Sequence, residues 1–151
     1  MDHTVHMDAA LRLAQEAFDR GDWPVASLIV RDGAVLATGQ NRQNTQRDLT
    51  VHAETDALRN AFRAHGTDLA GATLYGTMEP CPMCAEAIRM SGIRRVVLGL
   101  RHADLKRIDL GTYSIENFAK MMDWPLEVVN GVRHAECLEI RRRWAKDKVK
   151  A

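Results

Sequence analysis

The sequence predicts an α/β fold: a three-layer α/β/α sandwich in which a five-stranded mixed sheet lies between helices. Three observations carry this prediction. Short apolar segments of strand length alternate with longer segments of helical periodicity. The tight turn "RDG" at residues 31–33 joins the first two strands, which makes them antiparallel. Residues 101–125 separate the last two strands and include a helix, enough for a right-handed crossover, so these strands are expected to be parallel.

The elements of the N-terminal half follow from periodicity and from the breakers between them. Apolar residues from Ala10 to Phe18 recur at helical spacing until "GDW" interrupts them. "VASLIV" and "AVLATG" are strand-length apolar runs, and "QNRQNTQRD" is a polar loop. Thr50 is a plausible N-cap for the helix that follows. The expected elements are a helix over 8–19, strands over 25–30 and 34–39, and a helix over 50–65.

Proline and glycine mark the boundaries in the C-terminal half. Pro80 ends a strand, and Pro82 suits the first turn of a helix because its missing N–H costs nothing there. Gly92 ends that helix, and the strongly apolar "RVVLGL" follows as a strand. The expected elements are strands over 72–77, 95–100 and 126–132 and helices over 82–91, 114–122 and 135–148.

Length and composition favour one domain spanning residues 1–151. No apolar run is long enough to cross a membrane, and the N-terminus does not resemble a signal peptide, so we expect a cytoplasmic protein with no membrane partner. The formal net charge of +1 gives no global basic field for nucleic acid. The local exception is the C-terminal "RRRWAKDKVK", which is either a solvated helix face or an RNA contact.

Two of the three cysteines form the CxxC pair Cys81 and Cys84. Such a pair can be a redox dithiol, half of a structural zinc site, part of a catalytic metal site or two packed thiols. Here it opens a predicted helix, where spacing i, i+3 places both sulfurs on one face and the helix N-terminus favours thiolates. Cys137 lies in the C-terminal helix and is expected to be a buried apolar residue.

A second helix start supplies the missing donor. His52 lies in the first turn predicted after "QNRQNTQRD", and Glu54 follows two residues later. His52, Cys81 and Cys84 make three ligands, the number found in catalytic zinc sites that keep a fourth position for water. We therefore expect one zinc ion per chain, which would lower the pKa of that water to about 7. Glu54 is the expected proton shuttle, and its use as a fourth ligand is the alternative.

The motifs "HAE" at 52–54 and "PCPMC" at 80–84 resemble the signature of the cytidine deaminase superfamily. The resemblance covers nearly the whole chain and implies the same five-stranded fold. The parallel last strand is similar to the branch of guanine deaminase, yeast-type cytosine deaminase and tRNA adenosine deaminase. The resemblance implies hydrolytic attack on a ring carbon that bears an amine, with ammonia leaving after protonation by Glu54 and the N–H of Cys81 near the new hydroxyl.

The resemblance also implies substrate contacts. Asn41 matches a position whose amide orients the substrate ring, although an Asn that caps a turn is the alternative. Ala53 and Glu79, which lie in or beside the two motifs, are further candidates for substrate binding. Trp144 is a candidate lid residue on the C-terminal helix, although an aromatic residue at helical spacing is more often a plain packing residue.

The segments that select the substrate are similar to two different branches. "VRDGAVLATGQN" and "EPCPMC" look like guanine deaminase, whereas "DWPVAS" and the N-terminus look closer to tRNA adenosine deaminase, with Ala26 in place of the usual glycine. The bulky, charged segment after residue 100 resembles a guanine deaminase region that supplies an acidic pocket residue. Asp104 and Asp109 are the candidates here, and Tyr113 is a candidate for stacking; solvated loop aspartates and a core tyrosine are the alternatives.

The sequence therefore predicts a zinc-dependent hydrolytic deaminase of a free amino-substituted heterocycle, a nucleobase of the guanine or cytosine type. The enzyme alternative is a tRNA-specific adenosine deaminase that converts the wobble adenosine, so tRNA is a partner that we do not favour at this point. A zinc domain that only binds RNA through its basic C-terminus is the non-enzymatic alternative. The family resemblance implies a homodimer.

Overall fold

The computed structural model describes residues 2–150 and, in the last helix, side chains as far as residue 147. Its elements follow the predicted order, with two short helices added. In chain order they are α1 (Thr4–Arg20), β1 (Ala26–Arg31), β2 (Ala34–Gln40), α2 (Gln43–Gln46), α3 (Ala53–His65), β3 (Thr73–Met78), α4 (Pro82–Met90), β4 (Arg95–Leu100), the 3₁₀ helix η1 (His102–Leu105), α5 (Ile115–Met121), β5 (Glu127–Val129) and α6 (His134–Lys150).

The five strands form one mixed sheet in the order β2-β1-β3-β4-β5. β1 is antiparallel to both of its neighbours, whereas β3, β4 and β5 are mutually parallel. The predicted antiparallel first pair and parallel last pair are therefore confirmed. Asp32 and Gly33 have φ of 51° and 77° in the connecting turn, the backbone that a tight hairpin between right-twisted strands requires.

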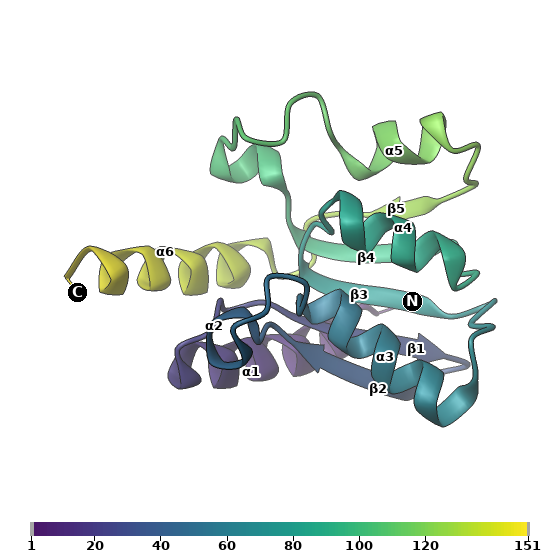
Figure 1. The fold of residues 1–151 in the computed structure, drawn as a ribbon, viewed down its shortest axis with the longest axis horizontal. Helices are drawn as coiled ribbons and strands as arrows, with labels where there is room; N and C mark the ends of the chain where they lie inside the picture. The colour runs from purple at the N-terminus through teal and green to yellow at the C-terminus, as the bar shows by residue number, and fades with distance from the viewer. Residues whose placement is uncertain (1, 151) are drawn as a thin grey trace.

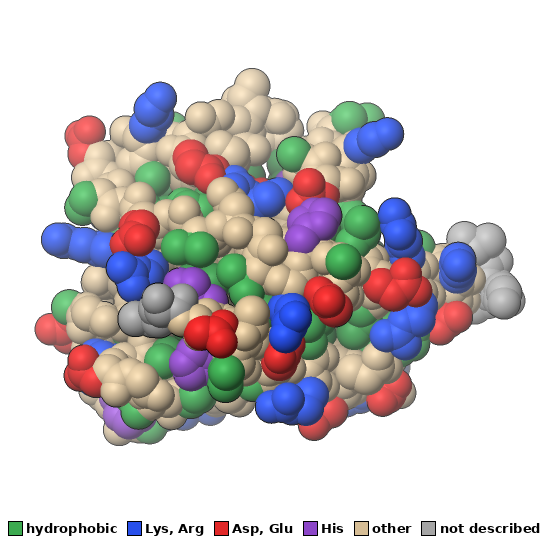
Figure 2. Space-filling view, turned by 180° about the vertical axis from the view of Figure 1, so that it is seen from behind, with side chains coloured by type: hydrophobic (Ala, Val, Ile, Leu, Met, Phe, Trp, Pro, Cys, Tyr) green, Lys and Arg blue, Asp and Glu red, His purple; other side chains and the backbone are tan. Residues whose placement is uncertain are grey.

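Helices cover both faces of the sheet, as the sandwich prediction requires (Figure 1). α3, α4 and α5 enclose one apolar core, in which Ile29, Leu74 and Leu98 are fully buried. α1 and α6 enclose the other, around Met7, Leu28 and Tyr75. Figure 2 shows the α1 and α6 face, where acidic and basic side chains are interspersed. No helix of the described residues has the length and apolar character needed to cross a membrane.

Two boundaries differ from the prediction for local reasons, and two short helices are added. α3 begins at Ala53 rather than Thr50, because the Thr50 hydroxyl bonds to the Asp48 carboxylate instead of capping the helix. The strand expected over 126–132 is only β5, since Gly131 takes φ of 74° where the chain turns into α6. α2 and η1 occupy segments that were expected to be irregular.

The topology brings four chain segments to one edge of the sheet. β2, β3 and β4 end there, and the antiparallel β1 begins there. α3 and α4 start at the same edge, and α6 projects beyond it (Figure 1). Residues that follow or precede these elements are thereby collected in one place.

Candidate metal centre and active site

Two helix N-termini hold the three predicted metal ligands. His52 is the N-cap residue of α3, and Cys81 is the N-cap residue of α4, with Cys84 in the first turn of that helix. The Thr55 hydroxyl accepts a hydrogen bond from the His52 N–H at 3.0 Å, which fixes the start of α3. Pro82 occupies the first turn of α4, as predicted.

The position of α3 depends on a close backbone approach. Gly39 lies in β2 directly under the first turns of the helix, and a Cβ built on it would lie 2.2 Å from the Ala53 carbonyl oxygen and 2.3 Å from the Ala57 nitrogen. Only glycine leaves room for that contact. The helix that begins beside His52 thus rests on the backbone of β2.

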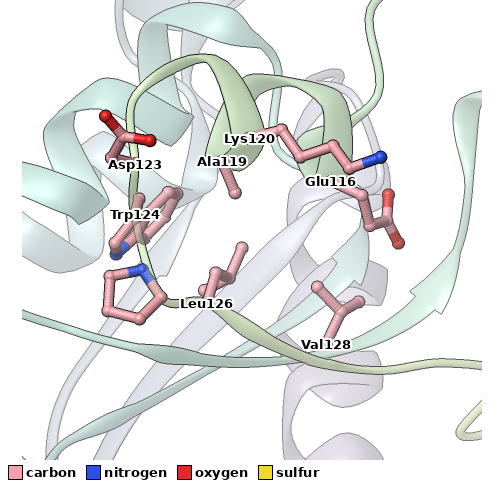
Figure 3. Close-up of a pocket in the computed structure, with 8 residues that line it drawn as sticks. Glu116, Ala119, Lys120, Asp123, Trp124, Leu126 and Val128 are labelled. Carbon is pink, nitrogen blue, oxygen red and sulfur yellow. The ribbon is translucent and has the colours of Figure 1, made fainter.

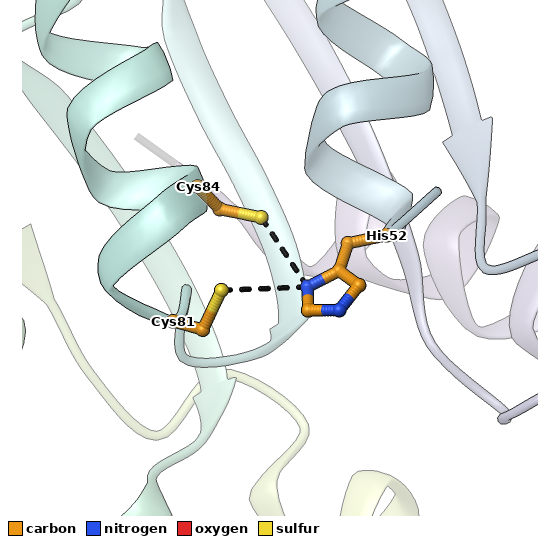
Figure 4. A group of neighbouring side chains, drawn as sticks. All are labelled: His52, Cys81 and Cys84. Carbon is orange, nitrogen blue, oxygen red and sulfur yellow. Dashed lines mark hydrogen bonds between the residues drawn. The ribbon is translucent and has the colours of Figure 1, made fainter. Parts of the chain in front are cut away.

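The donor atoms of the three ligands converge on one point (Figure 4). The Nδ1 atom of His52 lies 3.4 Å from the Sγ of Cys81 and 3.5 Å from the Sγ of Cys84. All three donor atoms lie within 4.8 Å of one another. Around tetrahedral zinc, bond lengths of about 2.0 Å to nitrogen and 2.3 Å to sulfur place such donors about 3.5 Å apart. The side chains therefore fit zinc without rearrangement.

Mutual hydrogen bonding explains the electrostatics of this group. A hydrogen bond from Cys84, and then one from His52, lowers the pKa of Cys81 well below the ordinary value of a thiol, although burial opposes this. The hydrogen bond to Cys81 in turn raises the pKa of His52. The site therefore stabilises a thiolate, which is the form that binds zinc.

Glu54 lies in the first turn of α3 beside the ligands but outside the group of three converging donors. Its side chain is only 3% exposed. Burial raises the pKa of Glu54, and the negative charge of Cys81 raises it further. The surroundings of Glu54 thus favour its protonated form, which suits a group that takes up and releases a proton during a reaction.

A cavity of about 740 Å³ opens in front of the metal ligands. Its walls include eight of the predicted site residues, Trp144 among them, together with Trp23, and they come from all four segments at the sheet edge. The predicted site residues on its walls besides Trp144 are Asn41, His52, Ala53, Glu54, Glu79, Cys81 and Asp109.

Asn41 and Ala53 both line the cavity. Asn41 follows β2 and is buried, and its side chain forms a pair with Gln43. Its Nδ2 donates to the Gln43 Oε1 at 2.7 Å, and its Oδ1 accepts from the Gln43 N–H at 3.1 Å. The turn-capping alternative is thus present in the structure, while the same amide remains on the cavity wall.

Glu79 lines the cavity, but its carboxylate accepts hydrogen bonds from other groups of the protein. Its Oε1 accepts from the Arg101 Nε and from the His102 N–H, both at 3.0 Å, and its Oε2 accepts from the Ile115 N–H at 2.9 Å. These contacts join the ends of β3 and β4 to the start of α5. The geometry makes Glu79 a support of the cavity wall.

The three candidate substrate-binding residues after residue 100 lie in different surroundings. Asp109 reaches the cavity, but its side chain is 60% exposed and paired with Arg107. Asp104 accepts from the Arg101 N–H and lies 3.2 Å from the His134 Nε2, and Tyr113 donates its hydroxyl to the Pro80 carbonyl. Among the described residues that line the cavity, neither Asp104 nor Tyr113 is included. Asp104 and Tyr113 thus make contacts within the protein, and their roles in substrate binding stay predictions.

Trp144 and Cys137 show how α6 meets the cavity. Trp144 is buried and packs edge-on against Phe18 with ring centroids 5.5 Å apart, and it lies 5.7 Å from Trp23. It is thus a packed wall residue of the cavity in this chain. Cys137 is buried, as predicted, and its sulfur sits over Gly99, where a Cβ would approach it to 2.4 Å.

The sequence interpretation missed several cavity residues, among them His102, Arg107 and Arg141. Arg141 places its guanidinium over Trp23 at 4.3 Å, in a cation–π contact. "RRRW" marks the position of Arg141, but only the fold directs it to the cavity. His102 stands in no motif at all.

A second, smaller cavity of about 380 Å³ lies between α5 and β5 (Figure 3). Its labelled side chains include Glu116, Lys120 and Asp123 around the apolar Leu126 and Val128. It is separate from the converging donors. The chemistry of the protein is therefore assigned to the larger cavity.

Comparison with known proteins agrees with this geometry. Residues 1–100 match the cytidine and deoxycytidylate deaminase zinc-binding region. The chain is 34% identical over 153 residues to a tRNA-specific adenosine deaminase of Agrobacterium fabrum, covering 97% of this chain and 96% of that protein.

Two solved structures resemble the fold. A structure from work on A-to-I editing by tRNA:A34 deaminases has a TM-score of 0.75 at 35% identity, covering 89% of this chain and 96% of that one. Guanine deaminase from Nitrosomonas europaea has a TM-score of 0.82 at 26% identity, covering 95% and 85%. The chain therefore belongs to the zinc-binding deaminases of the cytidine and deoxycytidylate deaminase family.

Proposed function

We propose that this protein is a hydrolytic deaminase of adenosine in tRNA. The observation that carries the proposal is the end-to-end similarity to a tRNA-specific adenosine deaminase, which covers 96% of that relative. The proposal replaces a free guanine or cytosine base, which the sequence interpretation preferred, as the first substrate to test. The chemistry is the same for both, because each is an amino-substituted heterocycle.

Different residues on the cavity wall have different roles in the proposed reaction. His52, Cys81 and Cys84 would hold the zinc ion, which supplies an activated water nucleophile when bound. The Glu54 carboxylate takes a proton as attack begins and returns it to the departing amine, so that ammonia leaves. The Asn41 side chain offers an amide donor and acceptor to orient the ring.

Basic side chains at the cavity support a nucleic-acid substrate. Arg107, Arg141 and Arg142 line it, although the whole chain has a net charge of only +1. The α1 and α6 face carries interspersed charges of both signs (Figure 2). Positive charge at the site itself suits contacts to phosphates that flank a base held in the cavity.

A free base of the guanine type is the second candidate. It is supported by the fold similarity to guanine deaminase and by the aromatic wall of Trp23 and Trp144. A cavity of about 740 Å³ lies in the range for a small-molecule site. The homodimer implied by the family resemblance remains part of the proposal.

Ammonia release from the zinc-loaded chain tests both candidates. The substrates are a tRNA anticodon stem-loop with adenosine at the wobble position and a panel of free bases that contains guanine, cytosine and adenine. Release from the stem-loop and none from free bases supports the first candidate, and the reverse supports the second. A zinc-loaded chain that binds the stem-loop but releases no ammonia from any substrate would support the non-enzymatic RNA-binding alternative.

A further inference from the structure

We propose that His102 is a substrate-recognition residue whose imidazole hydrogen-bonds the heterocycle to be deaminated. The inference rests on the proposed deaminase function and deepens it by naming a second polar contact besides Asn41. In this proposal His102 selects the substrate ring, whereas the zinc site and Glu54 carry out the reaction.

The hydrogen bonds of His102 are the first evidence. The side chain is buried, with the residue 7% exposed, yet among the described residues neither Nδ1 nor Nε2 makes a hydrogen bond of normal geometry, although the Pro80 backbone lies near enough to interact with the ring. Its backbone N–H, by contrast, donates to the Glu79 Oε1 at 3.0 Å. Buried polar atoms are rarely left unpaired, because each costs stability until a partner arrives. An unpaired imidazole inside a cavity therefore indicates that a ligand completes its hydrogen bonds.

The location of His102 is the second evidence. It lines the same cavity as His52, Glu54 and Cys81. Tyr113 stands beside its ring, with centroids 6.0 Å apart and planes inclined at 57°, and the Tyr113 hydroxyl is anchored to the Pro80 carbonyl. The cavity wall thus orients the imidazole before a ligand binds, as is typical of a pre-organised binding group.

The opposite wall carries the other polar contact. Asn41 follows β2 and His102 follows β4, with β1 and β3 between them. Three strand spacings of about 4.8 Å separate these two strands by about 14 Å. Two side chains that reach inward from positions this far apart leave room for one planar heterocycle over the metal ligands at the starts of α3 and α4.

The chemistry of the imidazole fits such a ring. Burial lowers the pKa of His102, so the neutral form, with one donor and one acceptor nitrogen, is favoured. An amino-substituted heterocycle presents donors and acceptors along its edge. His102 lies outside the group of converging metal donors, so a role as zinc ligand is not supported.

The test compares His102→Leu with His102→Gln, which keeps a donor and an acceptor, and with His65→Leu as an exposed control. The probes are the wobble-adenosine stem-loop and free guanine. KM and kcat are measured for whichever probe releases ammonia, and Kd is measured by calorimetry in zinc-loaded chains that also carry Glu54→Gln. We expect His102→Leu to raise KM and Kd about tenfold or more, and His102→Gln to stay within about threefold.

Thermal unfolding separates recognition from a structural role. Removal of an unpaired buried polar group leaves Tm unchanged or raises it, so His102→Leu should bind poorly while folding at least as well as the parent. Unchanged KM and Kd in an active His102→Leu chain would overturn the inference and leave the proposed function standing. A lower Tm in both His102 variants would also overturn it. A parent chain that neither deaminates nor binds either probe would overturn the proposed function and the inference together.

Discussion

The reactive wall of the cavity and its selecting wall are built on different principles. The reactive wall consists of His52, Glu54, Cys81 and Cys84 at two helix N-termini, and its groups face one another. The selecting wall consists of residues 101–109 and of α6, and most of its polar groups are paired inside the protein. The reactive wall comes from two short motifs, each at the start of a helix. The selecting wall is assembled from side-chain contacts between distant segments.

That difference teaches where substrate choice resides. Zinc ligation needs donors about 3.5 Å apart, a demand that does not depend on the substrate. The selecting wall is not bound to any such fixed distance between its side chains. Within the described part of this wall, the ring nitrogens of His102 are buried and make no hydrogen bond of normal geometry. A wall of this kind accommodates different rings while the metal site stays the same.

The largest expected effect is on the reactive wall. Cys84→Ser removes one of three zinc ligands, and we expect zinc content and ammonia release to fall to background. Metal analysis by mass spectrometry and the ammonia assay check this. The matched control is Cys137→Ser, which lies outside the donor group. Full zinc occupancy in Cys84→Ser would contradict the three-ligand site.

Glu54→Gln tests the proton shuttle separately from the metal. We expect zinc content to stay at the parental level while kcat falls by about 10²–10⁴-fold, because the amide cannot transfer the proton. Steady-state kinetics and metal analysis on the same preparation check this. A variant that lost zinc along with activity would point to Glu54 as a ligand instead.

Arg101→Met tests how the selecting wall is supported. The Arg101 side chain is 19% exposed and contacts Glu79, Glu116 and Asn130, and its removal leaves the buried Glu79 carboxylate without its charged partner. We expect a loss of about 3–5 kcal/mol in the free energy of unfolding, measured by urea denaturation.

The matched control for Arg101→Met is Arg95→Met. Arg95 pairs with Glu127 in a more exposed position, so its loss should cost about 1 kcal/mol or less. Equal losses in the two variants would show that burial of Glu79 does not set the strength of the contact.

Asp22→Asn gives the smallest expected effect and one that depends on pH. Asp22 is buried; burial opposes its ionisation, but hydrogen bonds from Arg20 and Thr45 hold its pKa below the ordinary value. A lowered native pKa contributes stability that is present above the ordinary pKa of about 4 and is lost as pH falls through the native pKa. The free energy of unfolding of the parent should therefore exceed that of the variant by about 1–3 kcal/mol at pH 7.

The pH dependence itself is the decisive measurement for Asp22. Urea denaturation from pH 7 to pH 2 should show the difference between parent and variant shrinking below about pH 4. A difference that stays constant across this range would show that the charge of Asp22 does not stabilise the fold.

How much the sequence could predict follows the same division. The fold, its strand directions and the three ligands were predictable, because "HAE" and "PCPMC" each open a helix and helix starts collect at one sheet edge. The substrate contacts expected of Asp104 and Tyr113 stay predictions, and their partners in the structure, the Arg101 N–H and the Pro80 carbonyl, are set by loop geometry that the sequence does not define. His102 carries no local signal, since the lack of partners for its ring nitrogens is visible only in three dimensions.

The Gly39 contact has a consequence for how this protein can change. A methyl group there would collide with the Ala53 carbonyl, so β2 and the first turns of α3 cannot keep this spacing with any other residue at position 39. A larger residue would push the start of α3 away from β2, and His52 lies at that start. A position without a side chain, thirteen residues before the histidine, therefore sets how closely the ligand on α3 can approach the two sulfurs on α4.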